Sequence, residues 1–271
     1  RNASEDTVIE VHRRAAAWNR ANNFYEDAVY HSVEVQDYGY AADVMNTWFT
    51  PLISVAQIIT VERWYEHLPL AEIEQRPDLA IKIAYALVFL RRNQKLRPIL
   101  EILQRRKATG DIHKTTDPSV VRSMAAIEAD DIENAFNIIQ KVNVRDPHSE
   151  GFSGFELGAG ANLAAYFAVA AGDHGAAREL QAHARAHNAR SGATFSGGYT
   201  FGITGITLMS LLCTSWCTGP DTSVTSAPIS AKDSAIAIPI LPVEKFPIYR
   251  TGSIRSYVGP AVTSAFFPFN G

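Results

Sequence analysis

The chain has 271 residues, of which 46% are hydrophobic and 20% are charged, and its 25 Lys and Arg residues against 28 Asp and Glu residues give a net charge of −3. This length admits one elongated domain or two compact domains with a sizeable core. The slightly negative charge excludes a global positive field that would steer the chain to nucleic acid, so we expect no direct nucleic-acid binding.

Neither a membrane-crossing segment nor a disulfide framework is expected. No apolar run approaches the roughly 20 residues that span a bilayer, and the opening RNASEDTVIE carries acids where a signal peptide carries bases. The two cysteines, Cys213 and Cys217, lack the second pair that a zinc site needs. We therefore expect a cytoplasmic protein with no cofactor and no metal.

The first 70 residues predict helices that pack on one another. One stripe of apolar residues at helical spacing comprises Val8, Val11, Ala15 and Trp18. A second runs from Tyr25 to Val33 after a break at Asn22 and Asn23, which predicts a helical hairpin. A third segment, residues 41–48, is expected to be interrupted at Pro51, and a fourth, residues 58–68, to end before Pro69.

After Pro77 the pattern becomes a repeat of helical pairs. The pairs cover residues 78–92 with 96–106, 118–129 with 131–142, and 155–172 with 173–190. Asp131 followed by Ala135 matches Asp173 followed by Ala177, 42 residues later, and Asn93 with Arg97 is a weaker match 38 residues before Asp131. A period near 40 is typical of tetratricopeptide-like or HEAT-like solenoids. The predicted fold is all-α, an α-α superhelix of helical hairpins with about eight to eleven helices over residues 6–212.

Residues 12–80 also carry an ordered series of motifs. The sequence HRRAAAWNRANNFYEDAVYHSVEVQDYGYAADVM begins at His12 and is followed by Trp64, Leu68-Pro69 and the RPDLA of residues 76–80. In this order the motifs resemble the middle of the large MalT-type bacterial transcription activators of the LuxR group, over residues 8–212. The resemblance implies that residues 1–75 correspond to the end of an ATPase-linked module. It implies that residues 76–212 are a tetratricopeptide-like sensor, which binds an inducer and relays that event to oligomerisation and promoter binding.

Residues 213–271 change in character. They hold seven of the thirteen prolines, a single leucine at 241 and no helical periodicity. We expect an irregular or disordered Pro/Ser/Thr-rich tail, interpreted as a frameshifted or otherwise non-homologous end of a truncated gene. A Pro-rich β appendage is the alternative, favoured by the apolar runs IAIPIL and YVGPAV.

No motif indicates catalysis. The chain contains no GxxxxGK[ST] and no LuxR-type helix-turn-helix, so we expect neither ATP hydrolysis nor operator binding. Gly158-Ala159-Gly160 lacks the third glycine and the preceding strand of a dinucleotide site. Without a nucleophile elbow or a closely spaced carboxylate pair, we expect the protein not to be an enzyme.

Three further groups of residues have both a structural and a functional interpretation. Glu179, His183 and His187 share a helix face that could hold a metal, but nearby arginines disfavour a cation and a solvated face is preferred. Basic clusters at residues 91–97 and 105–107 are interpreted as cations favoured by helix dipoles, with a phosphate or acidic partner as the alternative. Glycines at residues 154–160 and 192–205 are interpreted as allowing close helix packing, with close approach of a ligand to the backbone as the alternative.

The candidate ligand-binding residues are Asn162, Tyr166, Tyr199 and Tyr85. Asn162 and Tyr166 are one helical turn apart, and Tyr199 begins the corresponding helix of the next repeat. The three tyrosines lie on first helices of repeats, which line the concave face of tetratricopeptide-like solenoids. We predict a concave patch for a small polar inducer or a protein partner, with core packing as the alternative fate of the tyrosines.

The leading functional hypothesis is therefore the effector-sensing and protein-interaction region of a MalT-like regulator. Self-association through the helical repeats is a further expectation. The second hypothesis is a free-standing helical-repeat adaptor that binds a peptide or protein in its groove. An enzyme built on an α/α scaffold has the least support.

Overall fold

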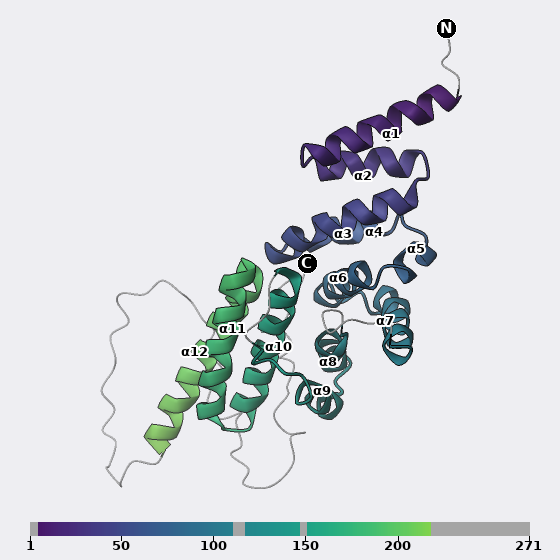
Figure 1. Cartoon of the computed structure of the whole chain (residues 1–271). Helices are drawn as coiled ribbons and strands as arrows, with labels where there is room; N and C mark the ends of the chain where they lie inside the picture. Colours follow the sequence, from purple (N-terminus) through teal and green to yellow (C-terminus); the bar gives the residue numbers. More distant parts are fainter. Residues whose placement is uncertain (1–4, 111–116, 147–150, 218–271) are drawn as a thin grey trace.

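The computed structural model describes residues 5–110, 117–146 and 151–217, with the backbone alone for Glu5 and residues 206–217. Every regular element in these ranges is an α-helix, which confirms the predicted all-α class (Figure 1). The twelve helices are α1 (Glu5–Ala21), α2 (Tyr25–Glu34), α3 (Tyr38–Ser54), α4 (Ile58–Tyr65), α5 (Leu70–Glu74), α6 (Pro77–Phe89), α7 (Asn93–Ala108), α8 (Ser119–Glu128), α9 (Ile132–Ile139), α10 (Gly151–Ala170), α11 (His174–Ser191) and α12 (Thr194–Cys217). This is one more than the expected range allows, because the five-residue α5 forms a separate helix after Pro69.

Six turns between helices share one hydrogen-bonding pattern. In each turn a residue with positive φ donates its N–H to the carbonyl three residues earlier, and the next residue donates to the carbonyl five residues earlier. This is the Schellman arrangement, which satisfies the last carbonyls of one helix while the second donor already caps the next helix. The positive-φ residues are Asn23, Gln36, Ala56, Arg91, Asp130 and Gly172.

The same six turns fix which side of the following helix faces inward. Four residues after each N-cap stands an apolar side chain that is at most 3% exposed. These residues are Ala28, Ala41, Val61, Leu96, Ala135 and Ala177. Each hairpin therefore places a small or aliphatic residue at its tightest point, where the two helices leave the turn together.

The repeat register inferred from acidic turn residues is partly correct. Asp131 and Asp173 are both N-caps, and their side chains accept hydrogen bonds from backbone N–H groups three residues later, at 3.4 and 2.9 Å. The match of Asn93 with Arg97 is wrong by one residue, because Arg92 caps α7 and the buried position is Leu96. The alignment of the repeats is defined by the N-cap residue of each turn, which the sequence alone did not predict at Arg92.

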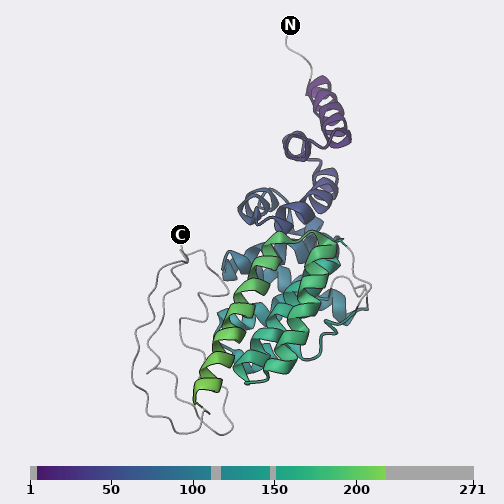
Figure 2. The same cartoon turned by 90° about the vertical axis from the view of Figure 1, so that its left-hand side faces the viewer.

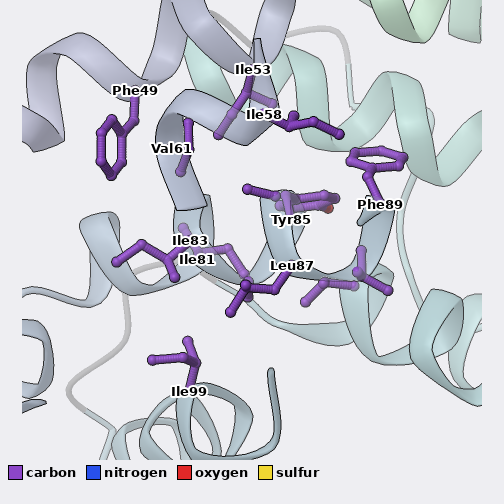
Figure 3. Packing of buried hydrophobic residues seen from close by; sticks show 14 of the residues in the cluster. Phe49, Ile53, Ile58, Val61, Ile81, Ile83, Tyr85, Leu87, Phe89 and Ile99 are labelled. Atoms are coloured by element: carbon purple, nitrogen blue, oxygen red, sulfur yellow. The ribbon is translucent and has the colours of Figure 1, made fainter. Parts of the chain in front are cut away.

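Helix α6 is the centre of the core. Every residue from Leu79 to Phe89 is buried, so the helix has no solvent face. Helices α3, α4, α7 and α8 pack around it, and Figure 3 shows Phe49, Val61 and Ile99 from three of these helices gathered about its apolar side chains. The buried cluster is continuous from Ala28 to Ile203. The division at residues 75 and 76 stays a prediction from the resemblance.

The two ends of the described chain are arranged differently. Helices α1 and α2 form the predicted hairpin, which projects from the rest of the molecule in both views (Figures 1 and 2). Helices α10, α11 and α12 lie side by side, and α12 begins against the end of α3, where the Thr194 hydroxyl donates to the Ser54 carbonyl at 3.2 Å. None of the described helices combines the length and apolarity needed to cross a bilayer.

Three sequence expectations are wrong. Pro51 does not interrupt its helix but lies inside α3, which continues to Ser54. Helix α12 extends through Cys213 to Cys217, so helix continues where the sequence predicts irregular structure; the tail from residue 218 on lies outside the described residues. The predicted stripe on α1 is not its packing face, because Val8, Val11 and Trp18 are 45, 59 and 60% exposed.

Candidate functional site

Lys82 is a charged residue buried within the central helix. It is 8% exposed, and its ammonium group donates to the backbone carbonyl and to the side-chain oxygen of Asn46 at 2.6 and 2.7 Å. The same group stands 5.6 Å from the ring centroid of Phe152 on α10. Burial lowers the pKa of Lys82 to about 8, although the charges of Asp78 and Glu156 act in the opposite direction. Two of the three N–H donors of this ammonium group are thus used by α3.

Glu156 approaches the same region from α10, one helical turn after Phe152. It is 7% exposed, and its Oε1 atom is buried without a hydrogen-bond partner. Burial raises the pKa of this carboxyl well above its usual range; the negative charges of Asp117 and Asp78 act in the same direction, while Lys82 opposes them. A raised pKa favours the protonated form of the carboxyl, and that form can donate a hydrogen bond.

Tyr85 lies one turn after Lys82 on α6. Its ring packs edge-on against Phe152 and Phe155, at centroid distances of 5.6 and 5.2 Å. The residue is fully buried, and its hydroxyl has no hydrogen-bond partner. Burial raises the pKa of the phenol well above its usual range. The Tyr85 hydroxyl and the Glu156 Oε1 atom are thus two buried polar atoms without partners, on helices that meet through their aromatic rings. We call Lys82, Tyr85 and Glu156 the α6–α10 polar cluster.

Asn162 and Tyr199, two of the predicted ligand residues, line one small crevice. Its other lining residues are Phe89, Met124, Ala159 and Ser196, and its volume is about 20 Å³. The Asn162 amide donates to the Ser196 carbonyl at 3.0 Å and accepts from the Thr200 hydroxyl at 2.8 Å. The Tyr199 ring is stacked on Phe89 at 6.3 Å. The crevice has room for one water-sized group, and the Asn162 amide is already used to join α10 to α12.

The other two predicted ligand residues lie outside this crevice. Tyr85 is in the core, as Figure 3 shows beside Phe89. Tyr166 is partly buried against Phe167, with centroids 5.5 Å apart, and burial raises its pKa to about 12. The predicted patch is therefore divided between three places. The ligand-binding role of all four residues stays a prediction.

The α6–α10 polar cluster contains two residues that sequence reasoning missed, Lys82 and Glu156. Each is a lone charge in an apolar helical stretch, IAYALVF following Lys82 and LGAGANLAAYF following Glu156. A charged residue with apolar neighbours on every side of a helix is a signal of a buried charge. The sequence therefore indicates that both residues are buried. It does not predict that they lie close together, because they are about 70 residues apart and helical periodicity is local.

The basic clusters are paired within the chain. Lys95 is 2.6 Å from Glu62 and also contacts Glu66, while Arg92 is 3.0 Å from Glu62. In the second cluster Arg105 pairs with Glu74 and Lys107 with Asp117. These cations join α7 to α4, to α5 and to Asp117, which lies just before α8. The helix-dipole interpretation therefore accounts for only part of their role.

His187 contradicts the solvated-face interpretation of α11. It is 1% exposed, and its Nε2 atom is 2.9 Å from the Val144 carbonyl, while Glu179 pairs with Arg145 at 3.2 Å. Across the described ranges, no group of three or more His, Cys, Asp and Glu side chains is placed to hold a metal ion.

The predicted close packing of glycines holds on α10 and fails on α12. A Cβ atom on Gly158 or Gly160 would meet neighbouring side chains at 2.2 and 3.1 Å. In contrast, Gly197, Gly198, Gly202 and Gly205 have nothing within 4 Å of such an atom. Among these glycines, Gly158 and Gly160 of α10 therefore permit a close approach of neighbouring elements.

Comparison with curated proteins finds a partial similarity to a large kinase. The serine/threonine-protein kinase PknK of Mycobacterium tuberculosis and that of Mycobacterium bovis are 25% identical to this chain over 144 residues. The match covers 51% of this chain but only 13% of the kinase. No protein-family model matches the chain, and no solved structure gives a significant match.

Proposed function

We propose that this chain is the effector-sensing and protein-interaction region of a MalT-like transcription regulator of the LuxR group, arranged as a superhelix of tetratricopeptide-like hairpins. The ordered motifs of residues 12–80 and the six hairpin turns of one geometry support this proposal. The match to a short segment of a much larger kinase is compatible with a helical region that serves as one part of a longer protein.

The observation that carries a sensing role is the α6–α10 polar cluster. Buried polar groups are almost always hydrogen-bonded, and a group without a partner costs about 1–3 kcal/mol. The Tyr85 hydroxyl and Glu156 Oε1 both lack partners in the interior. A bound molecule that forms hydrogen bonds with these two groups would remove this penalty. The removed penalty would then contribute to the free energy of binding.

The chemistry of the cluster selects the class of molecule. The ammonium group of Lys82, the hydroxyl of Tyr85 and the carboxyl of Glu156 in its protonated form can donate hydrogen bonds. The rings of Phe152 and Phe155 offer an apolar wall next to Tyr85. A small organic molecule with acceptor oxygens, such as a sugar or a small organic acid, suits these groups.

Binding at this place would change the packing of helices. Because Tyr85 is fully buried and packs against Phe152 and Phe155 of α10, a movement of α10 away from α6 would open a way to its hydroxyl. Helix α10 is also packed on α11 and α12, so its displacement would reach the far side of the molecule. A ligand that stabilises the separated arrangement would shift the population toward it, as a sensor requires.

A thermal-shift screen tests the proposal. The panel contains monosaccharides, sugar phosphates, dicarboxylic acids, amino acids and nucleotides, each titrated to saturation. A true ligand raises the unfolding temperature of the wild type, since a ligand at about 100 times its Kd stabilises by about 2.7 kcal/mol. Tyr85→Phe and Glu156→Gln should abolish that shift, while Tyr166→Phe, a tyrosine outside the cluster, should retain it.

Two outcomes would contradict the proposed site. One is a shift that persists in both Tyr85→Phe and Glu156→Gln. The other is a panel without any active compound, together with variants that are simply more stable than the wild type at every ligand concentration. The second outcome would mean that the two unpaired groups destabilise the fold and bind no ligand.

The adaptor that binds a peptide or protein is the second candidate. Phe201 on α12 favours it, because this large apolar side chain is 75% exposed next to the open Gly202. Loss of partner capture on Phe201→Ser, with the ligand response of the α6–α10 polar cluster absent, would favour the adaptor over the sensor.

A further inference from the structure

Helix α1 presents an apolar stripe that nothing in the described part of the chain covers. Val8, Val11 and Trp18 are 45, 59 and 60% exposed. The hairpin with α2 uses a different side of the helix, where Ala16 is 2% exposed. Figures 1 and 2 show α1 at the projecting end of the molecule, so this stripe is open to another molecule.

The stripe continues beyond the helix. Phe24, which is 52% exposed, stacks on Trp18 with ring centroids 5.9 Å apart and an interplanar angle of 22°. Two exposed aromatic rings held against each other form a rigid anchor of the kind that dominates protein interfaces. Contiguous exposed apolar surface of this kind marks an interaction site.

The order of residues along the stripe is self-complementary when the helix is reversed. Val8 and Trp18 are equally distant from residue 13, and so are Val11 and Ala15. A second copy of α1 lying antiparallel therefore places Val8 of one copy opposite Trp18 of the other. It also places Val11 opposite Ala15, so a larger side chain meets a smaller one in both pairs.

The charges beside the stripe have the same symmetry. Glu10 and Arg14 are exposed on the flank away from α2, and neither forms an ion pair within the described part of the chain. Asp6 and Glu10 lie in the first half of the helix and Arg14 and Arg20 lie in the second half, while Arg13 lies at its centre. An antiparallel copy brings acids to bases in both directions, and Glu10 of one copy comes next to Arg14 of the other. A parallel copy would bring like charges together.

We propose that α1 is a self-association surface, on which a second copy of this chain docks its own α1 in antiparallel orientation. The two-fold symmetry makes the interface isologous, so the assembly closes as a dimer. A contact between two helices of 17 residues lies at the small end of protein interfaces, so the dimer is weak. The inference does not depend on the proposed sensing function.

The first test is the oligomeric state of the intact chain by sedimentation velocity, from about 10 µM to about 1 mM, a range that covers weak dimers. We expect a concentration-dependent dimer. Trp18→Glu and, independently, Val11→Asp should weaken it by at least about tenfold. Ile59→Glu is the matched control, since Ile59 is 70% exposed on α4 and should leave the dimer unchanged. Circular dichroism checks that each variant is folded.

Charge exchange tests the antiparallel orientation. Glu10→Arg alone places two basic flanks together, and Arg14→Glu alone places two acidic flanks together, so each variant should be monomeric. An equimolar mixture should form a heterodimer, because every flanking pair is then of opposite charge. A wild type that stays monomeric at the highest concentration overturns the proposal. So does a dimer that survives Trp18→Glu and Val11→Asp, or a mixture that fails to associate.

Discussion

A Cβ atom on Gly158 would lie 2.2 Å from Oδ1 of Asn188, so α10 approaches α11 at a point where only glycine fits with Asn188 in its present position. Asn188 is 6% exposed, and its amide donates to the Thr200 hydroxyl on α12 at 3.2 Å. The same Thr200 hydroxyl donates to Asn162 of α10. This close approach therefore supports a polar network that joins three helices.

Replacing Gly158 with alanine should destabilise the protein by about 1–3 kcal/mol, because Asn188 must rotate away from Thr200 or the helices must separate. Urea denaturation measures the change. Gly202→Ala is the control: this exposed glycine in α12 has open space around it, so alanine should stabilise by about 0.5–1 kcal/mol. Adding Asn188→Ala to Gly158→Ala should recover part of the loss. Strictly additive effects would contradict the predicted clash.

Ala56 occupies a left-handed position, with φ at +66°, in the turn from α3 to α4. Ala56→Gly should stabilise the chain by up to about 1 kcal/mol. A non-glycine residue is strained by about 1–2 kcal/mol in this conformation, and glycine removes the strain. Glycine also increases the entropy of the unfolded chain, which offsets part of the gain. The reciprocal change, Gly172→Ala, at φ +77° in the equivalent turn, should destabilise by a similar amount. Equal signs for the two changes would show that the turns differ in more than the residue at this position.

Glu128 should make stability depend on pH. Its side chain is 1% exposed, both carboxylate oxygens lack hydrogen-bond partners, and Arg91 is 3.8 Å away. Burial raises the pKa of this carboxyl from 4.5 to about 7, against the opposing charge of Arg91. Because the folded-state pKa lies above the unfolded one, the stabilising contribution is complete below pH 4.5 and is lost as the pH rises through 7.

The measurement is the free energy of unfolding of wild type and Glu128→Gln between pH 4 and pH 8, a range that brackets both pKa values. The glutamine variant should gain on the wild type by about 3 kcal/mol as the pH increases, with most of the gain between pH 5 and pH 7.5. Lys82 and Glu156 contribute equally to the pH dependence of both proteins, so their contributions cancel in the difference between the two free energies of unfolding. A difference that does not change with pH would mean that Glu128 reaches solvent.

Asn162→Ala should destabilise the chain by about 1–3 kcal/mol, because the Ser196 carbonyl and the Thr200 hydroxyl lose a buried partner. Asn134→Ala, which removes an exposed amide from α9, should change stability by less than about 0.5 kcal/mol. Thermal denaturation of the three proteins measures this. A neutral Asn162→Ala would return this residue to the ligand-binding role predicted from sequence.

Helical spacing, breaks at Asn22-Asn23 and Pro77, and the 42-residue recurrence of Asp131 and Asp173 were enough to predict an all-α chain and most of its hairpins. These features are local, since a helix and its cap depend on residues within one or two turns. The Schellman turns were not predictable at Gln36, Ala56 and Arg91, because those residue types carry no preference for positive φ. There the contacts of the flanking helices impose the backbone conformation.

The candidate site depended on distances that the sequence does not encode. Lys82 and Glu156 were visible as lone charges, but only the tertiary structure brings α10 against α6 and leaves Tyr85 without a partner. The stripe on α1 was also visible in the sequence, yet its periodicity could not say whether α2 would cover it. Periodicity determines which residues share a face of a helix. Which face is buried, and against what, is decided by the packing of segments distant in the chain.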